Sequence, residues 1–141
     1  MNSALDTSSF SNSPMKILGI DESVIESYFV AFNQEDFEQV SHLFAVQGSL
    51  NPPFAKEVKG KEEILNYLNA EAMGMQALPK SGVEQESTDA TQSYQVIGLV
   101  KTSFFTVNVS WTFQLNAAKE IETLTVRLLA DLPELLGLRR S

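Results

Sequence analysis

The stretch FTVNVSWTFQL, residues 105–115, decides the fold of this chain. Its odd-numbered positions are all large and apolar, and its even-numbered positions are all polar. Because side chains of a β-strand alternate between its two faces, this pattern predicts a long strand with one apolar and one polar face. Trp111, the only tryptophan of the chain, lies in the middle of the apolar face, and its indole N–H needs an acceptor when buried.

Length, charge and residue usage limit what the rest of the chain can be. With 141 residues we expect one domain around one core. The formal net charge of −8 opposes binding to a phosphate backbone, so we expect no nucleic-acid partner. The absence of cysteine excludes a disulfide, a thiolate catalyst and a thiolate metal site. No apolar run approaches the ~20 residues of a membrane helix, and we expect a cytoplasmic protein.

Three segments of the first half of the chain carry apolar residues at helical spacing. Residues 1–15 contain five serines and no such spacing, so we expect a disordered tail before a domain that spans residues 16–141. The predicted helices cover residues 21–32, residues 37–44 up to a stop at Gly48, and residues 61–73. Between the last two, Pro52 and Pro53 exclude a helix, and we expect a short strand or loop through Val58.

The second half of the chain favours strands. We expect a charged edge strand within residues 79–89, a strand over 94–102, the long strand at 105–115, a turn at 116–119 and a last strand at 122–129. Gly98 interrupts the second of these and indicates a bulge or a close backbone approach. Residues 132–138 have proline at their start and glycine near their end, which predicts a short amphipathic terminal helix.

Helices followed by antiparallel strands indicate an α+β fold in which helices cover one face of a curved antiparallel β-sheet. A curved sheet closed on one side by helices forms a cone with an apolar mouth. This is the shape of the nuclear-transport-factor-2-like superfamily.

Four stretches of the sequence point to a narrower family. ESYFVAFNQEDFEQVSHLFA (residues 26–45), GSLNPPFAKEVKGKEEIL (48–65), VSWTFQLN (109–116) and RLLADLPELL (127–136) resemble the C-terminal domain of the orange carotenoid protein and its stand-alone homologues in cyanobacteria. The sequence departs from that family at Phe104, where the family has a tryptophan, and at Arg127, where it usually has an aspartate.

The resemblance implies a carrier of a ketocarotenoid such as canthaxanthin or echinenone. It implies that Tyr28 and Trp111 donate hydrogen bonds to the keto oxygen of the pigment, whose two lone pairs can accept both. Further tunnel residues expected from the apolar face and from the resemblance are Phe32, Val100, Phe105, Val107, Val109 and Val126.

The same resemblance implies partners and a role. We expect a homodimer that shares one carotenoid, exchange of pigment with carotenoid-binding helical domain proteins as donor or acceptor, and transient membrane contact for pigment uptake. The role would be carotenoid transfer in photoprotection or antioxidant defence.

Other interpretations of these residues remain open. Trp111 and Tyr28 can be ordinary core residues, since both residue types are often buried with a hydrogen-bond partner. The same fold houses isomerases and dehydratases, which need ionisable groups in the pocket. The inward face of residues 105–115 carries no Asp, Glu, His or Lys, so we expect neither a catalytic nor a metal-binding residue there. A ligand-free dimerisation module is the third alternative, and a filled cone would distinguish it.

Overall fold

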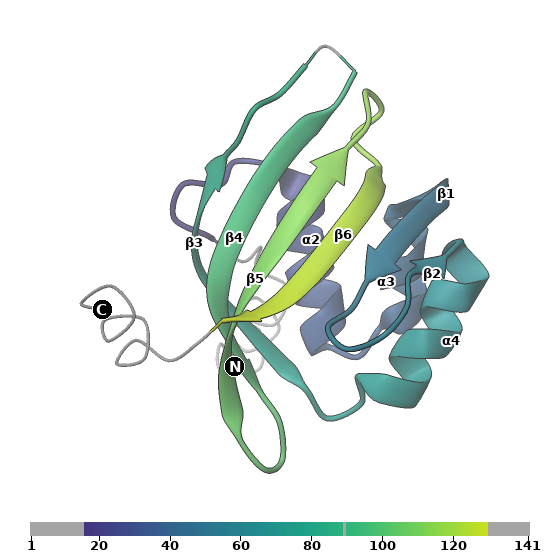
Figure 1. The fold of residues 1–141 in the computed structure, drawn as a ribbon, viewed down its shortest axis with the longest axis vertical. Helices are drawn as coiled ribbons and strands as arrows, with labels where there is room; N and C mark the ends of the chain where they lie inside the picture. The colour runs from purple at the N-terminus through teal and green to yellow at the C-terminus, as the bar shows by residue number, and fades with distance from the viewer. Residues whose placement is uncertain (1–15, 89, 130–141) are drawn as a thin grey trace, which may run out of the picture.

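The computed structural model describes residues 16–88 and 90–129, which form three helices and a six-stranded sheet (Figure 1). The helices are α2 (Ser23–Asn33), α3 (Phe37–His42) and α4 (Lys61–Glu71). The strands are β1 (Phe44–Asn51), β2 (Val58–Lys59), β3 (Gln76–Glu84), β4 (Gln92–Lys101), β5 (Thr106–Leu115) and β6 (Ile121–Leu129). The predicted tail at 1–15 and the predicted helix at 132–138 lie outside the described residues.

The sheet is curved and open, with the strand order β2-β1-β6-β5-β4-β3. The α+β fold with helices against a curved sheet is therefore confirmed. The sheet is mixed rather than wholly antiparallel, because β1 runs parallel to β6. The paired residues of these two strands are separated by more than half of the sequence, as Leu50 and Leu124 are. No local sequence pattern indicates whether such distant strands run parallel or antiparallel.

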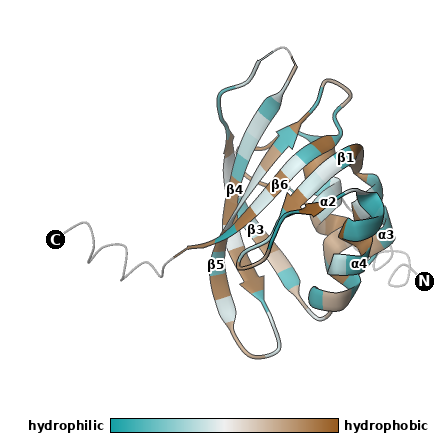
Figure 2. Ribbon diagram, turned by 45° about the vertical axis from the view of Figure 1, so that its right-hand side comes forward, coloured by the Kyte–Doolittle hydropathy of each residue, from teal (hydrophilic) through white to brown (hydrophobic). Residues whose placement is uncertain are grey.

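The helices lie together on one side of the sheet (Figure 2). The core between the two layers contains Phe29 from α2, Phe44 from β1 and Phe113 from β5, and none of these side chains has measurable exposure. Burial of such side chains contributes roughly 1.5–3 kcal/mol each, so this layer supplies much of the stability. Among the described residues, no helix is long and apolar enough to cross a membrane.

The long strand has the register that its alternation predicts. Trp111 pairs with Val96 on one side and with Val126 on the other, so the three side chains share the face toward the helices. Along β5 this face is buried from Val109 to Leu115, whereas Phe105, which directly precedes the strand, is 59% exposed. The apolar face therefore belongs to the core in the middle of the strand and reaches solvent at its beginning.

The prediction for the second helix was wrong beyond its sixth residue. The helix ends at His42, and Phe44 begins strand β1, where it pairs with Ile121 and is fully buried. Helical spacing of Phe37, Val40 and Phe44 misled the prediction, because the same apolar residues enter the core from a short helix and then from a strand. Helix α4 ends at Glu71, two residues earlier than predicted.

Gly98 lies at a close approach between two strands, as its position predicted. It pairs with Pro79 on β3, and the register shifts between Pro79 and Ser81, so an extra residue bulges there. A methyl group on Gly98 would overlap the carbonyl oxygen of Leu78 and would lie 2.8 Å from the Cα of Pro79. Only glycine leaves room for the edge strand to approach this closely.

Candidate functional site

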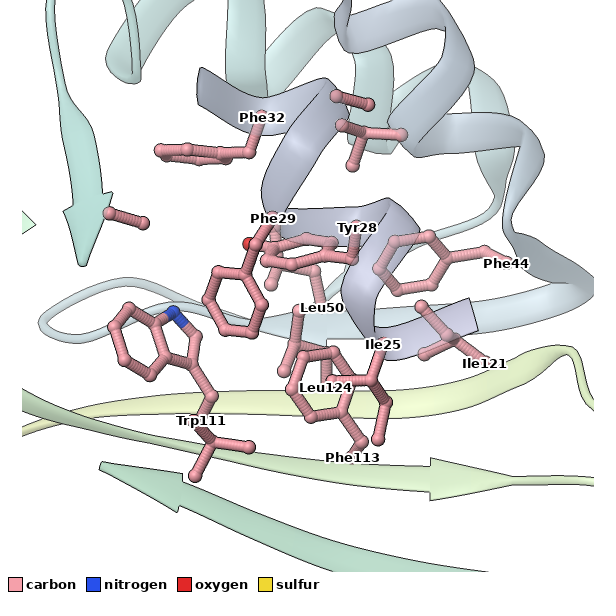
Figure 3. Packing of buried hydrophobic residues seen from close by; sticks show 14 of the residues in the cluster. Ile25, Tyr28, Phe29, Phe32, Phe44, Leu50, Trp111, Phe113, Ile121 and Leu124 are labelled. Carbon is pink, nitrogen blue, oxygen red and sulfur yellow. The ribbon is translucent and has the colours of Figure 1, made fainter. Parts of the chain in front are cut away.

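Two buried hydrogen-bond donors, Tyr28 on α2 and Trp111 on β5, line the same cavity. Tyr28 is 3% exposed and Trp111 is 2% exposed. Phe29 separates them and contacts both: its ring centroid lies 5.1 Å from that of Tyr28 and 4.8 Å from that of Trp111, edge-to-face in each case. Figure 3 shows the Tyr28 oxygen and the Trp111 nitrogen on the same side of this aromatic cluster, toward Phe32. The packing holds both polar atoms toward one region.

Neither donor has a hydrogen-bond partner among residues 16–88 and 90–129. Buried tyrosine and tryptophan side chains usually find one. No side-chain nitrogen or oxygen in this part of the chain is both sealed from solvent and unbonded, so the hydroxyl of Tyr28 and the indole N–H of Trp111 open onto the cavity. Two donors that lack an acceptor among the described residues, in an apolar cavity, suit a ligand oxygen with two lone pairs.

Burial raises the pKa of Tyr28 far above the ordinary tyrosine value. The charged phenolate would lose its hydration in this environment, which favours the neutral form. Tyr28 therefore stays neutral and retains its proton for donation at every physiological pH.

The cavity has a volume of about 290 Å³ and a predominantly apolar lining. All eight predicted site residues line it, although they come from three separate parts of the chain: Tyr28, Phe32, Val100, Phe105, Val107, Val109, Trp111 and Val126. That they bind a pigment stays a prediction, but the structure brings them into one place.

A second set of lining residues was missed by the sequence analysis. The loop Pro52 to Phe54 and helix α4 close the cavity opposite the sheet, and α4 contributes Tyr67 and Glu71 to the lining. The remaining members of the set are Leu68, Ala72, Met75, Thr102 and Leu128. The amphipathic pattern of α4 predicts that one face is buried, but it does not report which strand that face meets.

Three exposed phenylalanines lie at or beside the opening: Phe54 and Phe105 line the cavity, and Phe104 precedes Phe105 in the β4–β5 loop. Phe54 is 93% exposed, Phe104 is 90% exposed, and Phe105 is 59% exposed. Phe54 also has a φ of 64°, which is uncommon for a side chain of this size. The loop thus holds Phe54 outward beside the cavity rather than folding it into the core, and the mouth is an exposed apolar surface.

Arg127, which differs from the family pattern, does not line this cavity but lines an adjoining pocket together with the loop Pro52 to Phe54. It pairs with Ser110 on β5, and Ser110 points to the opposite face of the strand from Trp111. Val126, which precedes Arg127 in β6, pairs with Trp111 and lines the cavity. The change at Arg127 therefore alters the surface beside the Phe54 loop and not the lining of the main cavity.

The cavity offers little for acid–base or metal chemistry. Among the described lining residues, Glu71 is the only carboxylate, and it stands at the exposed end of helix α4. No group of three or more metal-ligating side chains occurs in the described part of the chain.

Comparison with known proteins fits this geometry. Residues 20–124 match the nuclear transport factor 2 (NTF2) domain. The chain belongs to the NTF2 domain family. This NTF2 domain is homologous to the orange carotenoid-binding protein of Limnospira maxima, with 33% identity over 88% of this chain and 40% of the relative.

Solved structures agree with this assignment. The domain superposes on the orange carotenoid protein of Anabaena (Nostoc) sp. in a structure described as binding canthaxanthin, with a TM-score of 0.80, 32% identity and coverage of 89% of this chain and 41% of that one. The match is to the C-terminal domain of that protein, so the chain spans about 40% of the length of these relatives. A putative polyketide cyclase from Sinorhizobium meliloti shares the fold alone, at 20% identity and a TM-score of 0.63 over 76% of this chain and 95% of that one.

Proposed function

We propose that this protein is a ketocarotenoid carrier that holds the keto ring of the pigment between Tyr28 and Trp111. The observation that carries the proposal is the pair of buried donors without partners in the described residues, both open to the same apolar cavity. Canthaxanthin and echinenone each carry a ring ketone that would accept from both donors. Homology to orange carotenoid proteins supports a carotenoid ligand.

The energetics divide between orientation and affinity. Each hydrogen bond to the keto oxygen contributes roughly 0.5–1.5 kcal/mol net, which orients the ring. Most of the affinity comes from burying the polyene, at about 25 cal/mol per Å² of apolar surface. A binding site of this kind releases its ligand only when another apolar surface receives it, which is what a carrier requires.

We further propose that the holoprotein is a homodimer sharing one carotenoid. A cavity of about 290 Å³ encloses one end ring and the adjoining polyene, not the whole forty-carbon rod. The exposed mouth around Phe54 and Phe104 supports a second copy covering the rest. The protein would take up the pigment by transient contact with a membrane and then exchange it with carotenoid-binding helical domain proteins. Its role would be cytoplasmic, in photoprotection or antioxidant defence.

The test is to mix the purified protein with canthaxanthin, separate it by size exclusion and record the visible spectrum of the protein peak. A red-shifted carotenoid band should travel with the protein, and Tyr28→Phe or Trp111→Phe should weaken binding about three- to tenfold. Tyr94→Phe is the matched control, because the Tyr94 hydroxyl donates to Glu22 at 2.8 Å outside the cavity. A colourless peak, under conditions in which the Anabaena protein becomes coloured, would refute the proposal.

The alternatives are less well supported. An isomerase or dehydratase needs an acid and a base inside the pocket, and the only carboxylate of the described lining is exposed at the mouth. A ligand-free dimerisation module would be expected to fill its cone with side chains, whereas this cone has a cavity with unused donors. We therefore propose that the protein is not an enzyme, and turnover of a ketone substrate by the purified protein would contradict that.

A further inference from the structure

The polar groups that line the cavity lie at two depths. Tyr28 and Trp111 are at most 3% exposed and form the inner pair. Tyr67 is half-buried and Glu71 is exposed, and they form an outer pair at the mouth. The lining between the pairs is apolar, and the hydroxyl of Thr102 is already engaged with Phe105 in the β4–β5 loop.

The outer pair combines a donor with an acceptor. Tyr67 and Glu71 are four residues apart on α4, which places them on the same face of the helix. Burial, and then the negative charge of Glu71, raises the pKa of Tyr67, so its hydroxyl stays protonated beside the carboxylate. Neither side chain has a hydrogen-bond partner in the described part of the chain. A hydroxyl group can accept from Tyr67 and donate to Glu71 at once.

A full-length carotenoid does not use the outer pair. With its keto ring at Tyr28 and Trp111, it passes the mouth as a hydrocarbon chain, and Tyr67 and Glu71 face carbon. A shorter molecule that ends at the mouth in an oxygen would satisfy both pairs. The cavity volume of about 290 Å³ matches such a molecule, since pockets that enclose most of a drug-sized ligand begin at about 300 Å³.

We propose that the cavity also takes a cleaved carotenoid: a molecule of about half the length, with a ring ketone at the inner pair and a terminal hydroxyl between Tyr67 and Glu71. This inference rests on the proposed function in that both use Tyr28 and Trp111 for the ring ketone. It adds a second ligand class and a role for the outer pair. A ligand of this kind would be enclosed by one subunit and would not need a second copy.

The fluorescence of Trp111 can report ligand binding directly. Trp111 is the only tryptophan and lines the cavity, so a ligand that absorbs in the near ultraviolet quenches its emission on binding. Titration with 4-oxoretinol, which has the ring ketone and the terminal hydroxyl, should give saturable quenching by a monomer. Retinol, which lacks the ketone, and the methyl ether of 4-oxoretinol, which cannot donate to Glu71, should each bind about three- to tenfold more weakly.

Variants then assign the effect to the outer pair. Glu71→Gln should weaken 4-oxoretinol about three- to tenfold and leave its methyl ether within about twofold, because the ether has no hydrogen to donate. Tyr67→Phe should weaken both the alcohol and its ether, whose oxygen still accepts from Tyr67, and both variants should leave canthaxanthin within about twofold. Glu62→Gln is the matched control, since it lies on α4 with the same charge but outside the cavity lining. Absence of saturable quenching, or equal affinity for the alcohol and its ether, overturns the inference. Canthaxanthin uptake in the same preparation shows separately whether the carrier proposal stands.

Discussion

The ring of Phe29 stands edge-on to the indole of Trp111, with centroids 4.8 Å apart and planes at 87°. The contact joins helix α2 to strand β5 and fixes the plane of the indole, and with it the direction of the indole N–H. Edge-to-face aromatic pairs of this geometry contribute about 0.5–1.5 kcal/mol beyond their buried area. Phe29 carries no hydrogen-bonding group, yet it positions one of the two donors.

Phe29→Leu should therefore loosen Trp111 while preserving the fold. The change keeps an apolar side chain but removes the edge-to-face contacts of Phe29 with Tyr28, Trp111 and Phe113, so we expect a loss of about 1.5–4.5 kcal/mol in unfolding free energy. The near-ultraviolet circular dichroism of Trp111 should fall, and canthaxanthin should bind more weakly. Phe37→Leu is the control, because Phe37 is about as buried as Phe29 but makes its edge-to-face contact with Phe32, at 5.8 Å, and not with Trp111. An unchanged Trp111 signal in Phe29→Leu would contradict the positioning role.

Gly98→Ala should destabilise the protein although it adds only one methyl group. The new methyl would meet the backbone of Leu78 and Pro79, which cannot rotate away as a side chain would. We expect a loss of about 1–3 kcal/mol in urea unfolding. Gln95→Ala, on the outer face of the same strand, should change stability by no more than about 0.5 kcal/mol. Equal effects of the two changes would show that β3 tolerates a displacement.

The stability of the protein should decline in alkali because of its tyrosines. Burial raises the pKa of Tyr28 and of Tyr94, and the hydrogen bond to Glu22 adds to the effect at Tyr94. In the unfolded chain these phenols ionise near pH 10, so their contribution to stability is complete below that pH and is lost above it. For Tyr28 the loss is up to about 1.4 kcal/mol per pH unit.

Urea unfolding between pH 8 and pH 11 measures this decline. Tyr28→Phe should make the fall above pH 10 shallower, since it removes one of the groups that ionise on unfolding. Phenolate absorbance of the folded protein, followed in parallel, should lag behind that of the protein in urea. A phenolate signal that appears equally early in both states would refute the raised pKa values.

The proposed dimer predicts a specific effect of the exposed rim. The double change Phe54→Ser and Phe104→Ser should leave the stability of the subunit almost unchanged, because both rings are at least 90% exposed. It should prevent formation of the canthaxanthin-loaded dimer. Light scattering measures the mass of the particle, and absorbance gives the pigment-to-subunit ratio. Val46→Ser, at a 70% exposed apolar residue outside the cavity lining, is the control. A wild-type holoprotein that is monomeric with one pigment per subunit would refute the shared-pigment dimer.

The parts of the fold that were predictable depend on near neighbours in the sequence. Alternation along residues 105–115 predicted the β5 register with Trp111 inward, and Gly98 predicted the close approach to β3. The prediction failed at Phe44, where one apolar residue fits the end of a helix and the start of a strand equally well. It also missed the parallel pairing of β1 with β6, because contacts between segments so far apart leave no local pattern.

The sequence by itself determined which residues are apolar, which can donate a hydrogen bond, and how they alternate along each element. These properties sufficed for the fold class and, with the family resemblance, for the pair Tyr28 and Trp111. Only the tertiary structure decided that helix α4 closes the cavity, that Glu71 reaches its mouth, and that Arg127 lines an adjoining pocket instead of the cavity itself. Those facts depend on which surfaces pack against each other, and packing is a property of the whole chain and not of any segment.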